Sequence, residues 1–372
     1  MKVALVHDDF TQAGGAESLF ATIANLYPKA PIYTSLVDWE KVPESIDQSR
    51  IITSWIQKIP QAHKFYKALL PFYPLAFESF NFNKFDLVIS STTRFAKGVI
   101  TKPKTIHVCY INSVPRFLYD KKSQIDYLPA IFQYLLKPCL TWLKRWDQAS
   151  SNRVDRYISN SQNVAGKIRE VYSKKSQIIY PFADIEFFKP AEVHNWKLKS
   201  QDYLLVVSRL VRWKKIDIAI KACASAGINL KIIGAGPDLK RLKKIASSFK
   251  LSESGVEFLG RVSKENLREL YQNSHASVVT QEEDFGISVV EAQACGVPVL
   301  AYILGGQAEI IIDGKTGLYF SDQTEKSLED AIERLSKLKW TIANCRKNAE
   351  NFSRAVFVRK LKESIKSYAS KQ

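Results

Sequence analysis

The segment 276–300 reads ASVVTQEEDFGISVVEAQACGVPVL and combines an apolar run, a charged loop with a glycine, a helical pattern and a second apolar run. This order predicts a buried strand, a loop, a helix and another strand. The start of the helix would present backbone N–H groups at Gly286, Ile287 and Ser288. Because these N–H groups and the helix dipole both favour negative charge, the segment predicts an anion site.

Two glutamates accompany the predicted anion site: Glu283 in the loop and Glu291 on the first turns of the helix. Carboxylates repel an anion, so we interpret the pair as acceptors for hydroxyl groups attached to that anion. A sugar diphosphate on a ribose has this pattern, with hydroxyls at both ends and negative charge between them. Two alternatives stay open: a carboxylate that favours the helix dipole, for Glu291 alone, and a pair of glycosidase carboxylates.

The rest of the second half repeats strand, turn and helix. Apolar runs at 203–207, 230–233 and 256–259 each end in a glycine or basic turn. Strands that alternate with helices predict a parallel sheet, so these turns should line one crevice at the carboxyl edge of the sheet. The turn residues are Ser208, Arg209, Lys214, Gly234, Gly236, Gly260, Arg261 and Val262.

Arg209 and Lys214 would supply positive charge for a diphosphate. Arginine suits bidentate phosphate contacts, and lysine suits a point contact. A basic pair in an isolated loop is more often solvated surface. Beside a predicted anion-binding helix start, the diphosphate contact is favoured.

The first half opens with the same unit. An apolar run at 3–6 leads through a loop with Gly14 and Gly15 into a helical pattern that stops before Pro28, and further apolar runs follow it. The two glycines would let the backbone approach a ligand, or serve only as a tight turn. Asp8-Asp9 lacks the spacing of an Asp-x-Asp metal motif, and we interpret it as loop polarity.

The composition of the chain limits the kinds of partner that it can bind. The chain has 372 residues, 46% apolar, and a formal charge of +17. This charge favours an anionic partner, such as a nucleic acid, a lipid surface or a phosphorylated small molecule, or it is a solvated lysine-rich surface. Five scattered cysteines without CxxC spacing predict reduced thiols rather than disulfides or a zinc site. The first apolar run is too short for a signal peptide, and no uncharged stretch reaches a membrane span, so we expect a cytoplasmic protein.

Two segments of the first half have aromatic and basic residues. Residues 64–77 favour either a membrane-interface contact or a helix packed on the sheet. Residues 130–149 predict a helix with a basic face, kinked or split at Pro138. Ser161 is expected to cap the next helix.

The ordered set of turns in the second half, closed by Glu283 to Glu291, resembles the family 4 retaining glycosyltransferases, which have the GT-B fold. The first half, with Gly14-Gly15-Ala16-Glu17 and Pro115 to Asp120, resembles their mannosyltransferase-like branch. The resemblance implies an α/β fold of two doubly wound Rossmann-like domains facing a cleft. We expect an acceptor-binding domain over 1–183, completed by a helix over 355–372, and a nucleotide-sugar-binding domain over 184–354.

The resemblance also implies roles. Arg209 and Lys214 would hold the diphosphate, and Glu283 would contact the transferred sugar; these three are the expected catalytic residues. Glu291 would accept from the ribose hydroxyls. The other implied donor-binding residues are Gly14, Gly15, Ser208, Gly234, Gly236, Gly260, Arg261, Val262, Phe285, Gly286 and Ile287.

One position departs from the branch. Asn112 stands where a histidine is expected, shortly before Arg116. Both are expected on the acceptor side. Asparagine can hydrogen-bond a sugar hydroxyl but cannot titrate near neutral pH. In a retaining transfer the leaving phosphate can take the acceptor proton, so activity does not require this histidine. His107 is expected to be a core or lining residue.

The implied activity is transfer of a hexose, with mannose expected, to a glycan or lipid-linked acceptor in surface polysaccharide synthesis. No cofactor or metal is expected. GDP-mannose is the first expectation for the donor, with a UDP-sugar as the alternative. The positive charge of the chain and residues 64–77 add an anionic membrane surface to the expected partners. The protein would bind peripherally at the inner face of that membrane. The alternatives are a nucleotide-sugar epimerase of the same fold, or a basic nucleic-acid-binding protein; the dispersed basic residues disfavour nucleic acid.

Overall fold

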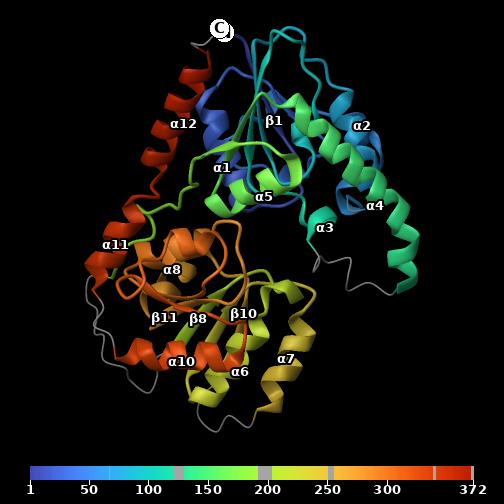
Figure 1. Ribbon diagram of the computed structural model, residues 1–372. Coiled ribbons are helices and arrows are strands. Elements are labelled where there is room, and N and C mark those ends of the chain that lie inside the picture. Colours follow the sequence, from blue (N-terminus) through green and yellow to red (C-terminus); the bar gives the residue numbers. More distant parts are fainter. Residues whose placement is uncertain (67, 121–129, 192–202, 250–254, 338–340, 370–372) are drawn as a thin grey trace. The chain divides into compact units, whose positions relative to one another are not determined.

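The computed structural model describes residues 1–66, 68–120, 130–191, 203–249, 255–337 and 341–369 (Figure 1). Its contacts divide the chain into unit 1, residues 1–180 with 358–372, and unit 2, residues 181–357. The division therefore falls three residues away from each expected boundary, because 181–183 and 355–357 pack within unit 2. Residues 192–202 of the expected second domain lie outside the described residues.

Unit 1 is built on a parallel sheet. Its strands are nearly continuous apolar runs, as strands buried on both faces require. The chain reverses its strand order between β1 and β4. Across the sheet the strands are β3 (Ile51–Thr53), β2 (Ile32–Thr34), β1 (Val3–His7), β4 (Leu87–Thr92), β5 (Ile106–Ile111), β6 (Arg156–Ser159) and β7 (Ser176–Ile178).

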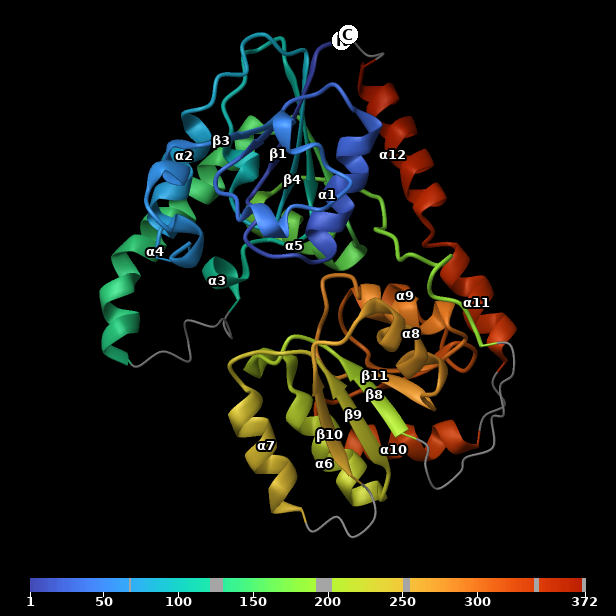
Figure 2. The same cartoon turned by 180° about the vertical axis from the view of Figure 1, so that it is seen from behind.

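Helices cover both faces of this sheet, with α2 and α4 on one face and α1 and α12 on the other (Figures 1 and 2). Ser161 caps α5 as expected, because its Oγ accepts a hydrogen bond from the N–H of Val164 at 3.0 Å. The helices are α1 (Gly15–Leu26), α2 (Tyr73–Glu78), α3 (Arg116–Tyr119), α4 (Ala130–Ser150), α5 (Gln162–Tyr172) and α12 (Arg354–Ala369). The 3-10 turns used below are η3 (Trp55–Lys58), η4 (Ala62–Lys64), η5 (Leu70–Phe72) and η6 (Ala96–Gly98).

The aromatic stretch 64–77 divides between core and surface. Tyr73 and Phe77 of α2 are buried in the core of unit 1, so this part packs on the sheet. Phe65, Phe72 and Leu75 are exposed. Of the two alternatives expected at Pro138, the split is wrong, because α4 continues as one helix across that proline, and the kink stays a prediction. In the part of the chain that the structure describes, no helix is both long and apolar enough to cross a membrane.

Asp8 and Asp9 are buried, so their interpretation as loop polarity is wrong. The carboxylate of Asp8 accepts hydrogen bonds from the N–H groups of the turn after β4. Burial would raise the pKa of Asp8, but the charge of Arg94, that of His7 and these hydrogen bonds outweigh it and hold the pKa below its usual value. Nη2 of Arg94 also lies 2.5 Å from Oδ2 of Asp9, so the two side chains form an ion pair. The two aspartates join the ends of β1 and β4.

A buried ion pair anchors α4. Lys97 of η6 donates to Asp147, and both side chains are fully buried. The hydroxyls of Tyr119 and Tyr172 donate to the other carboxylate oxygen of Asp147, at 2.8 and 2.7 Å. His107 is buried in the core, which is one of its two expected positions, and burial lowers its pKa to about 4.

Unit 2 has a second parallel sheet. The strand order reverses between β8 and β11, so the connections that leave these two neighbours run to opposite faces and open a crevice at their carboxyl ends. The strands in spatial order are β10 (Val256–Gly260), β9 (Asn229–Ile233), β8 (Tyr203–Val207), β11 (Ala276–Val279), β12 (Val299–Tyr302) and β13 (Gly317–Phe320).

Two helical layers cover the sheet of unit 2. One layer packs its apolar side chains into a core with β8, β9 and β11; it consists of α6 (Ile216–Ala226), α7 (Leu239–Ser248) and α10 (Glu325–Ser336). The other layer is α8 (Lys264–Gln272), α9 (Ile287–Ala294) and α11 (Ile342–Glu350). The 3-10 turns η9 (Arg212–Lys214) and η10 (Gly306–Glu309) follow β8 and β12.

Candidate active site

The crevice between β8 and β11 brings the two predicted halves of the site together. Lys214, on η9 after β8, donates a hydrogen bond from Nζ to Oε1 of Glu283, in the loop after β11. Lys214 is 7% exposed, so this is a partly buried ion pair. Its ammonium also lies 4.3 Å from the ring centroid of Trp213. A low-dielectric surrounding strengthens the interaction of this lysine with any anion that enters the crevice.

The position of Lys214 is set by its backbone. The hydroxyl of Thr280, directly after β11, donates to the carbonyl oxygen of Lys214 at 2.7 Å. The next residue, Lys215, has a φ of 50°, in the left-handed region, and ends η9. The turn after β8 is thus tied to the end of the neighbouring strand, which keeps the ammonium over the switch point.

Gln307 fixes the glutamate loop. Its side-chain oxygen accepts from the N–H of Glu283 at 2.9 Å. Its Nε2 donates to the carbonyl oxygens of Gln281, Tyr302 and Leu304 at 2.8, 2.9 and 2.6 Å. Gln307 is fully buried, so it joins the loops after β11 and β12. A lone glutamine has no sequence pattern that would predict this role.

The glycine at the start of α9 is required by the backbone. Gly286 has a φ of 108° and is the N-cap residue of α9. It lets the chain turn from the buried side chain of Phe285 into the helix. The N–H groups of Ile287 and Ser288 then lie in the first turn of α9, where a helix favours an anion. Glu283 lies three residues before the N-cap Gly286.

Glu291 lies on the next turn of α9. Its Oε2 accepts a hydrogen bond from the hydroxyl of the buried Tyr271 at 3.2 Å. Burial raises the pKa of Glu291 to about 7. Hydroxyl donors would stabilise the charged form of this buried carboxylate, because their hydrogen bonds offset part of the free energy that its desolvation costs.

Two glycines of the turn after β9 allow close backbone packing. A Cβ at Gly234 would overlap the carbonyl oxygen of Ser208, and one at Gly236 would overlap that of Leu210. Gly234, with a φ of 134°, also donates from its N–H to the carbonyl oxygen of Gly260 at 2.7 Å. The turns after β8, β9 and β10 are therefore in direct contact.

The remaining predicted residues of unit 2 lie at the same edge of the sheet. Arg209 is exposed and is the second residue after the end of β8. Gly260 ends β10 with a φ of 68°, and Arg261 and Val262 follow it. Ser208 donates from its N–H to the carbonyl oxygen of Ile233 at 3.0 Å.

The predicted residues of unit 1 lie at the carboxyl ends of β1 and β5. Gly14 and Gly15 are exposed at the start of α1, and Gly14 has an extended backbone that other residues also adopt. Asn112 donates from Nδ2 to Oγ of Ser91 at 3.0 Å. Arg116 opens α3 and lies 3.7 Å from Asp120.

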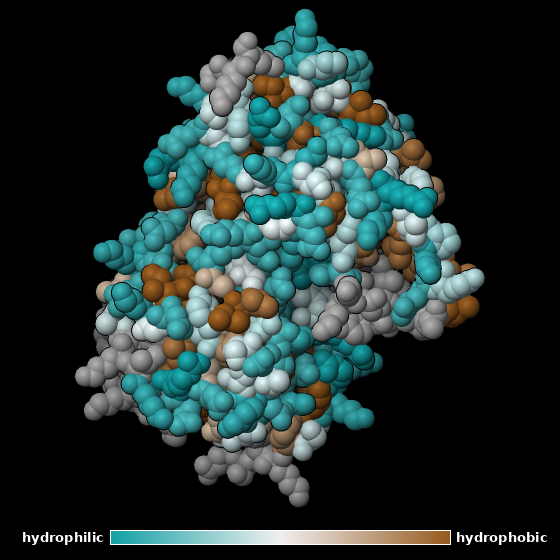
Figure 3. Space-filling model, in the orientation of Figure 1, coloured by the Kyte–Doolittle hydropathy of each residue, from teal (hydrophilic) through white to brown (hydrophobic). Residues whose placement is uncertain are grey.

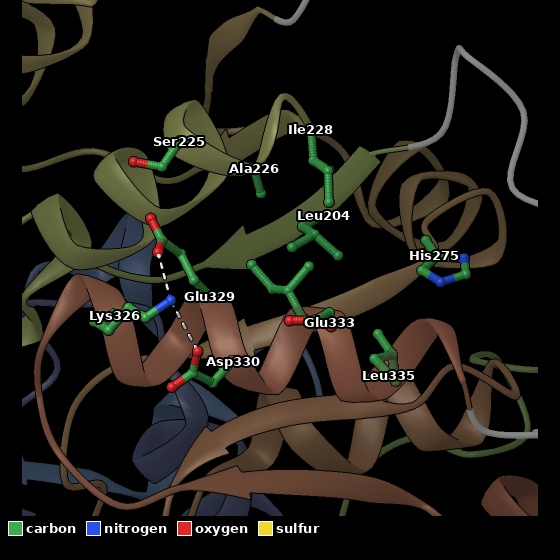
Figure 4. A pocket seen from close by; sticks show the side chains of 11 residues that line it. Leu204, Ser225, Ala226, Ile228, His275, Lys326, Glu329, Asp330, Glu333 and Leu335 are labelled. Atoms are coloured by element: carbon green, nitrogen blue, oxygen red, sulfur yellow. Dashed lines mark ion pairs between the residues drawn. The ribbon is translucent and has the colours of Figure 1, made fainter.

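A cavity of about 340 Å³ lies elsewhere in unit 2 (Figure 4). Leu204 and His275, at the starts of β8 and β11, line it together with charged residues of α10. Lys326 pairs there with Glu329 and Asp330, at 3.8 and 3.1 Å. Because ligands of doubly wound sheets bind at the carboxyl ends of the strands, this cavity at the amino ends is not the candidate site.

Comparison with known proteins shows which proteins this chain resembles. Residues 189–352 match the family described as glycosyl transferases group 1. The chain is a glycosyltransferase of the GT-B fold. An uncharacterized glycosyltransferase of Methanocaldococcus jannaschii is 26% identical over 317 residues, 78% of this chain and 76% of that protein. A D-inositol 3-phosphate glycosyltransferase of Rhodococcus erythropolis is 27% identical over 226 residues, 54% of this chain, and the match spans only 50% of that relative's length.

Solved structures share the fold of this glycosyltransferase over its whole length. HepE of Anabaena, in complex with UDP, superposes with a TM-score of 0.70 at 20% identity, over 99% of this chain and 100% of that one. The sucrose-phosphate synthase of Thermosynechococcus elongatus gives a TM-score of 0.76 at 18% identity, with all of both chains covered. At these identities the likeness shows the fold alone.

Proposed function

We propose that this glycosyltransferase moves a hexose, with retention of configuration, from a nucleotide-sugar to a glycan or lipid-linked acceptor in surface polysaccharide synthesis. The observation that carries the proposal is the pairing of Lys214 with Glu283 at the carboxyl ends of β8 and β11, beside the start of α9. Positive charge, a hydroxyl acceptor and helix N–H groups meet there, and a sugar diphosphate requires all three.

In this proposal the diphosphate lies against Lys214, Arg209 and the first turn of α9. Fixed positive charge stabilises the negative charge that develops on the leaving group. No metal is needed for that task. Glu283 then accepts from hydroxyls of the transferred sugar, and Glu291 accepts from those of the ribose. The leaving phosphate takes the acceptor proton, so an asparagine at position 112 is compatible with turnover.

Two candidate donors, a UDP-hexose and GDP-mannose, differ in their nucleobase. The neighbour HepE has been crystallised with UDP and with UDP-glucose, which favours a UDP-hexose. The mannosyltransferase-like pattern of the first half favours GDP-mannose. We place the UDP-hexose first, because the turns of unit 2 that would border the base belong to the fold shared with that neighbour.

The acceptor is assigned to unit 1, with Asn112 and Arg116 as its first candidate contacts. A lipid-linked acceptor would bring the enzyme to the cytoplasmic face of a membrane as a peripheral protein. The positive charge of the chain supports this location.

A donor panel tests the proposal. Purified protein is incubated with UDP-glucose, UDP-galactose and GDP-mannose, with and without a glycolipid extract, and the release of nucleoside diphosphate and the labelled product are measured. We expect one donor to be consumed faster when the extract is present. Lys214→Ala should reduce that rate by about 100-fold or more. No consumption of any donor, or equal rates for Lys214→Ala, would contradict the proposal.

A further inference from the structure

The N-terminal half of α4 carries an apolar stripe on the side that does not pack against unit 1. Its residues recur at helical spacing and lie within roughly 100° of arc around the helix. Large side chains in the stripe are strongly exposed: Ile131 is 61% exposed, Tyr134 75%, Leu135 64% and Trp142 44%. The α4 stripe consists of Ile131, Tyr134, Leu135, Pro138 and Trp142.

The other half of α4 holds the helix in place. Leu143 is buried in the core of unit 1. Trp146 donates from Nε1 to Oε1 of Glu78, on α2, at 2.7 Å, and Asp147 forms the buried pair with Lys97. The N-terminal half extends beyond α2 and α3 in both views (Figures 1 and 2). A helix anchored at one end presents the stripe on a fixed support.

The charges beside the α4 stripe have one sign. Lys137, Lys144 and Arg145 are exposed, and residues 130–146 contain no aspartate or glutamate. Tyr134 and Trp142 combine an apolar ring with a polar group, which suits the boundary between acyl chains and headgroups. Apolar residues flanked only by basic ones complement an anionic lipid surface.

A neighbouring segment has the same composition. Residues 55–77 contain no acidic residue. Phe65, Phe72 and Leu75 are exposed there, together with Lys58 and Lys64. In Figure 3, hydrophobic side chains gather along the edge of unit 1 where α2 and α4 lie.

We propose that the α4 stripe and its flanking basic residues dock this enzyme on an anionic lipid bilayer, with α4 lying in the interface. The stripe lies in unit 1 and does not include any residue of the donor site proposed in unit 2. Membrane docking can therefore fail while donor binding succeeds, and the reverse.

Flotation with lipid vesicles tests the proposal. The full chain is mixed with vesicles of phosphatidylcholine that contain about 30% phosphatidylglycerol, or with phosphatidylcholine alone. We expect binding to the anionic vesicles only, and weaker binding at high salt, because salt screens the basic residues. The double variant Leu135→Asp/Trp142→Asp should lower the partition coefficient by about tenfold or more.

A matched control changes two exposed apolar residues away from α4, as Ile100→Asp/Ile312→Asp; these side chains are 50% and 46% exposed. This control alters the net charge equally and should bind vesicles like the wild type. Both double variants should keep the wild-type melting temperature and UDP affinity. Brominated acyl chains should quench less tryptophan fluorescence in Trp142→Phe than in the wild type.

The proposal is overturned if the wild type does not float with anionic vesicles, or if the stripe variant floats equally well. Equal bromolipid quenching in Trp142→Phe would also overturn it. So would a wild-type dimer in ultracentrifugation that the stripe variant converts to a monomer, since the stripe would then belong to an interface with a second copy of the chain.

Discussion

Lys214 and Glu283 are 69 residues apart in sequence and share a hydrogen bond at the point where the strand order of unit 2 reverses. One follows β8 and the other follows β11, so the parallel sheet itself brings them together. Without a donor, the glutamate neutralises the lysine. A diphosphate would compete for the same ammonium, which makes this pair the part of the site that a ligand changes most directly.

Replacing Lys214 by alanine should reduce turnover by roughly 100- to 1,000-fold, because the charge that stabilises the leaving diphosphate is lost. Steady-state kinetics with the best donor measure the effect. Lys221→Ala, which removes an exposed lysine of α6 that lies 3.7 Å from Glu325, is the matched control and should leave kcat unchanged. A large loss in the control would show that general surface charge matters, rather than this position.

Replacing Gln307 by leucine should destabilise unit 2 by about 2 kcal/mol, because buried backbone groups of the loops after β11 and β12 lose their partner. UDP affinity should fall as well, since Glu283 loses the hydrogen bond to its N–H. Urea unfolding and calorimetry measure the two effects. Gln148→Leu, at an exposed position of α4, is the control. Unchanged stability in Gln307→Leu would mean that the loop holds its conformation without this clamp.

Donor affinity should depend on the ionisation of Glu291. Its pKa is raised from 4.5 to about 7 by burial, so the folded protein holds this proton more tightly than the unfolded chain. Its contribution to stability is therefore full at low pH and is lost as the pH rises through about 7. Hydroxyl donors of a ribose favour the charged form, so binding of UDP should release a proton.

The affinity for UDP should therefore rise by roughly tenfold between about pH 5.5 and 8. The diphosphate also titrates near pH 6, so the test is the difference between the wild type and Glu291→Gln in calorimetric titrations. The variant should retain only the pH dependence of the nucleotide. Identical pH profiles would remove Glu291 from the ribose contact.

The buried pair of Lys97 and Asp147 predicts an asymmetric response to mutation. Lys97→Met leaves an uncompensated carboxylate among the hydroxyls of Tyr119 and Tyr172, and should cost roughly 3–5 kcal/mol in the free energy of unfolding. The double variant Lys97→Met/Asp147→Leu should cost much less than the sum of the two single variants. Denaturant unfolding of all four proteins gives the coupling energy, and strict additivity would mean that the pair does not interact.

Much of the fold could be predicted because its strands are buried on both faces and so form continuous apolar runs. The apolar runs at 203–207, 230–233 and 256–259 lie in β8, β9 and β10, and the turns after them do lie at one sheet edge. The strand β3 has only three residues, too few for a recognisable period. The split at Pro138 was wrong: α4 continues through the proline, and the contacts that hold it in the core of unit 1 lie after position 138.

The structure brings together residues that were predicted from ordered turns, whereas isolated polar residues escaped prediction. Lys214 and Glu283 belong to patterns at strand ends. A lone glutamine at position 307 has no pattern, and its role appears only when two loops lie side by side. Adjacent aspartates at 8 and 9 resemble solvated loop residues, whereas Arg94 and the N–H groups that pair with them come from a turn more than 80 residues later.

The most direct test of the central claim is a crystal structure of the complex with UDP. We predict that the diphosphate lies within hydrogen-bond distance of Lys214 and of the first turn of α9, with the ribose hydroxyls on Glu291. A nucleotide bound elsewhere, for example in the cavity beside Leu204 and His275 at the amino ends of the strands, would contradict the account.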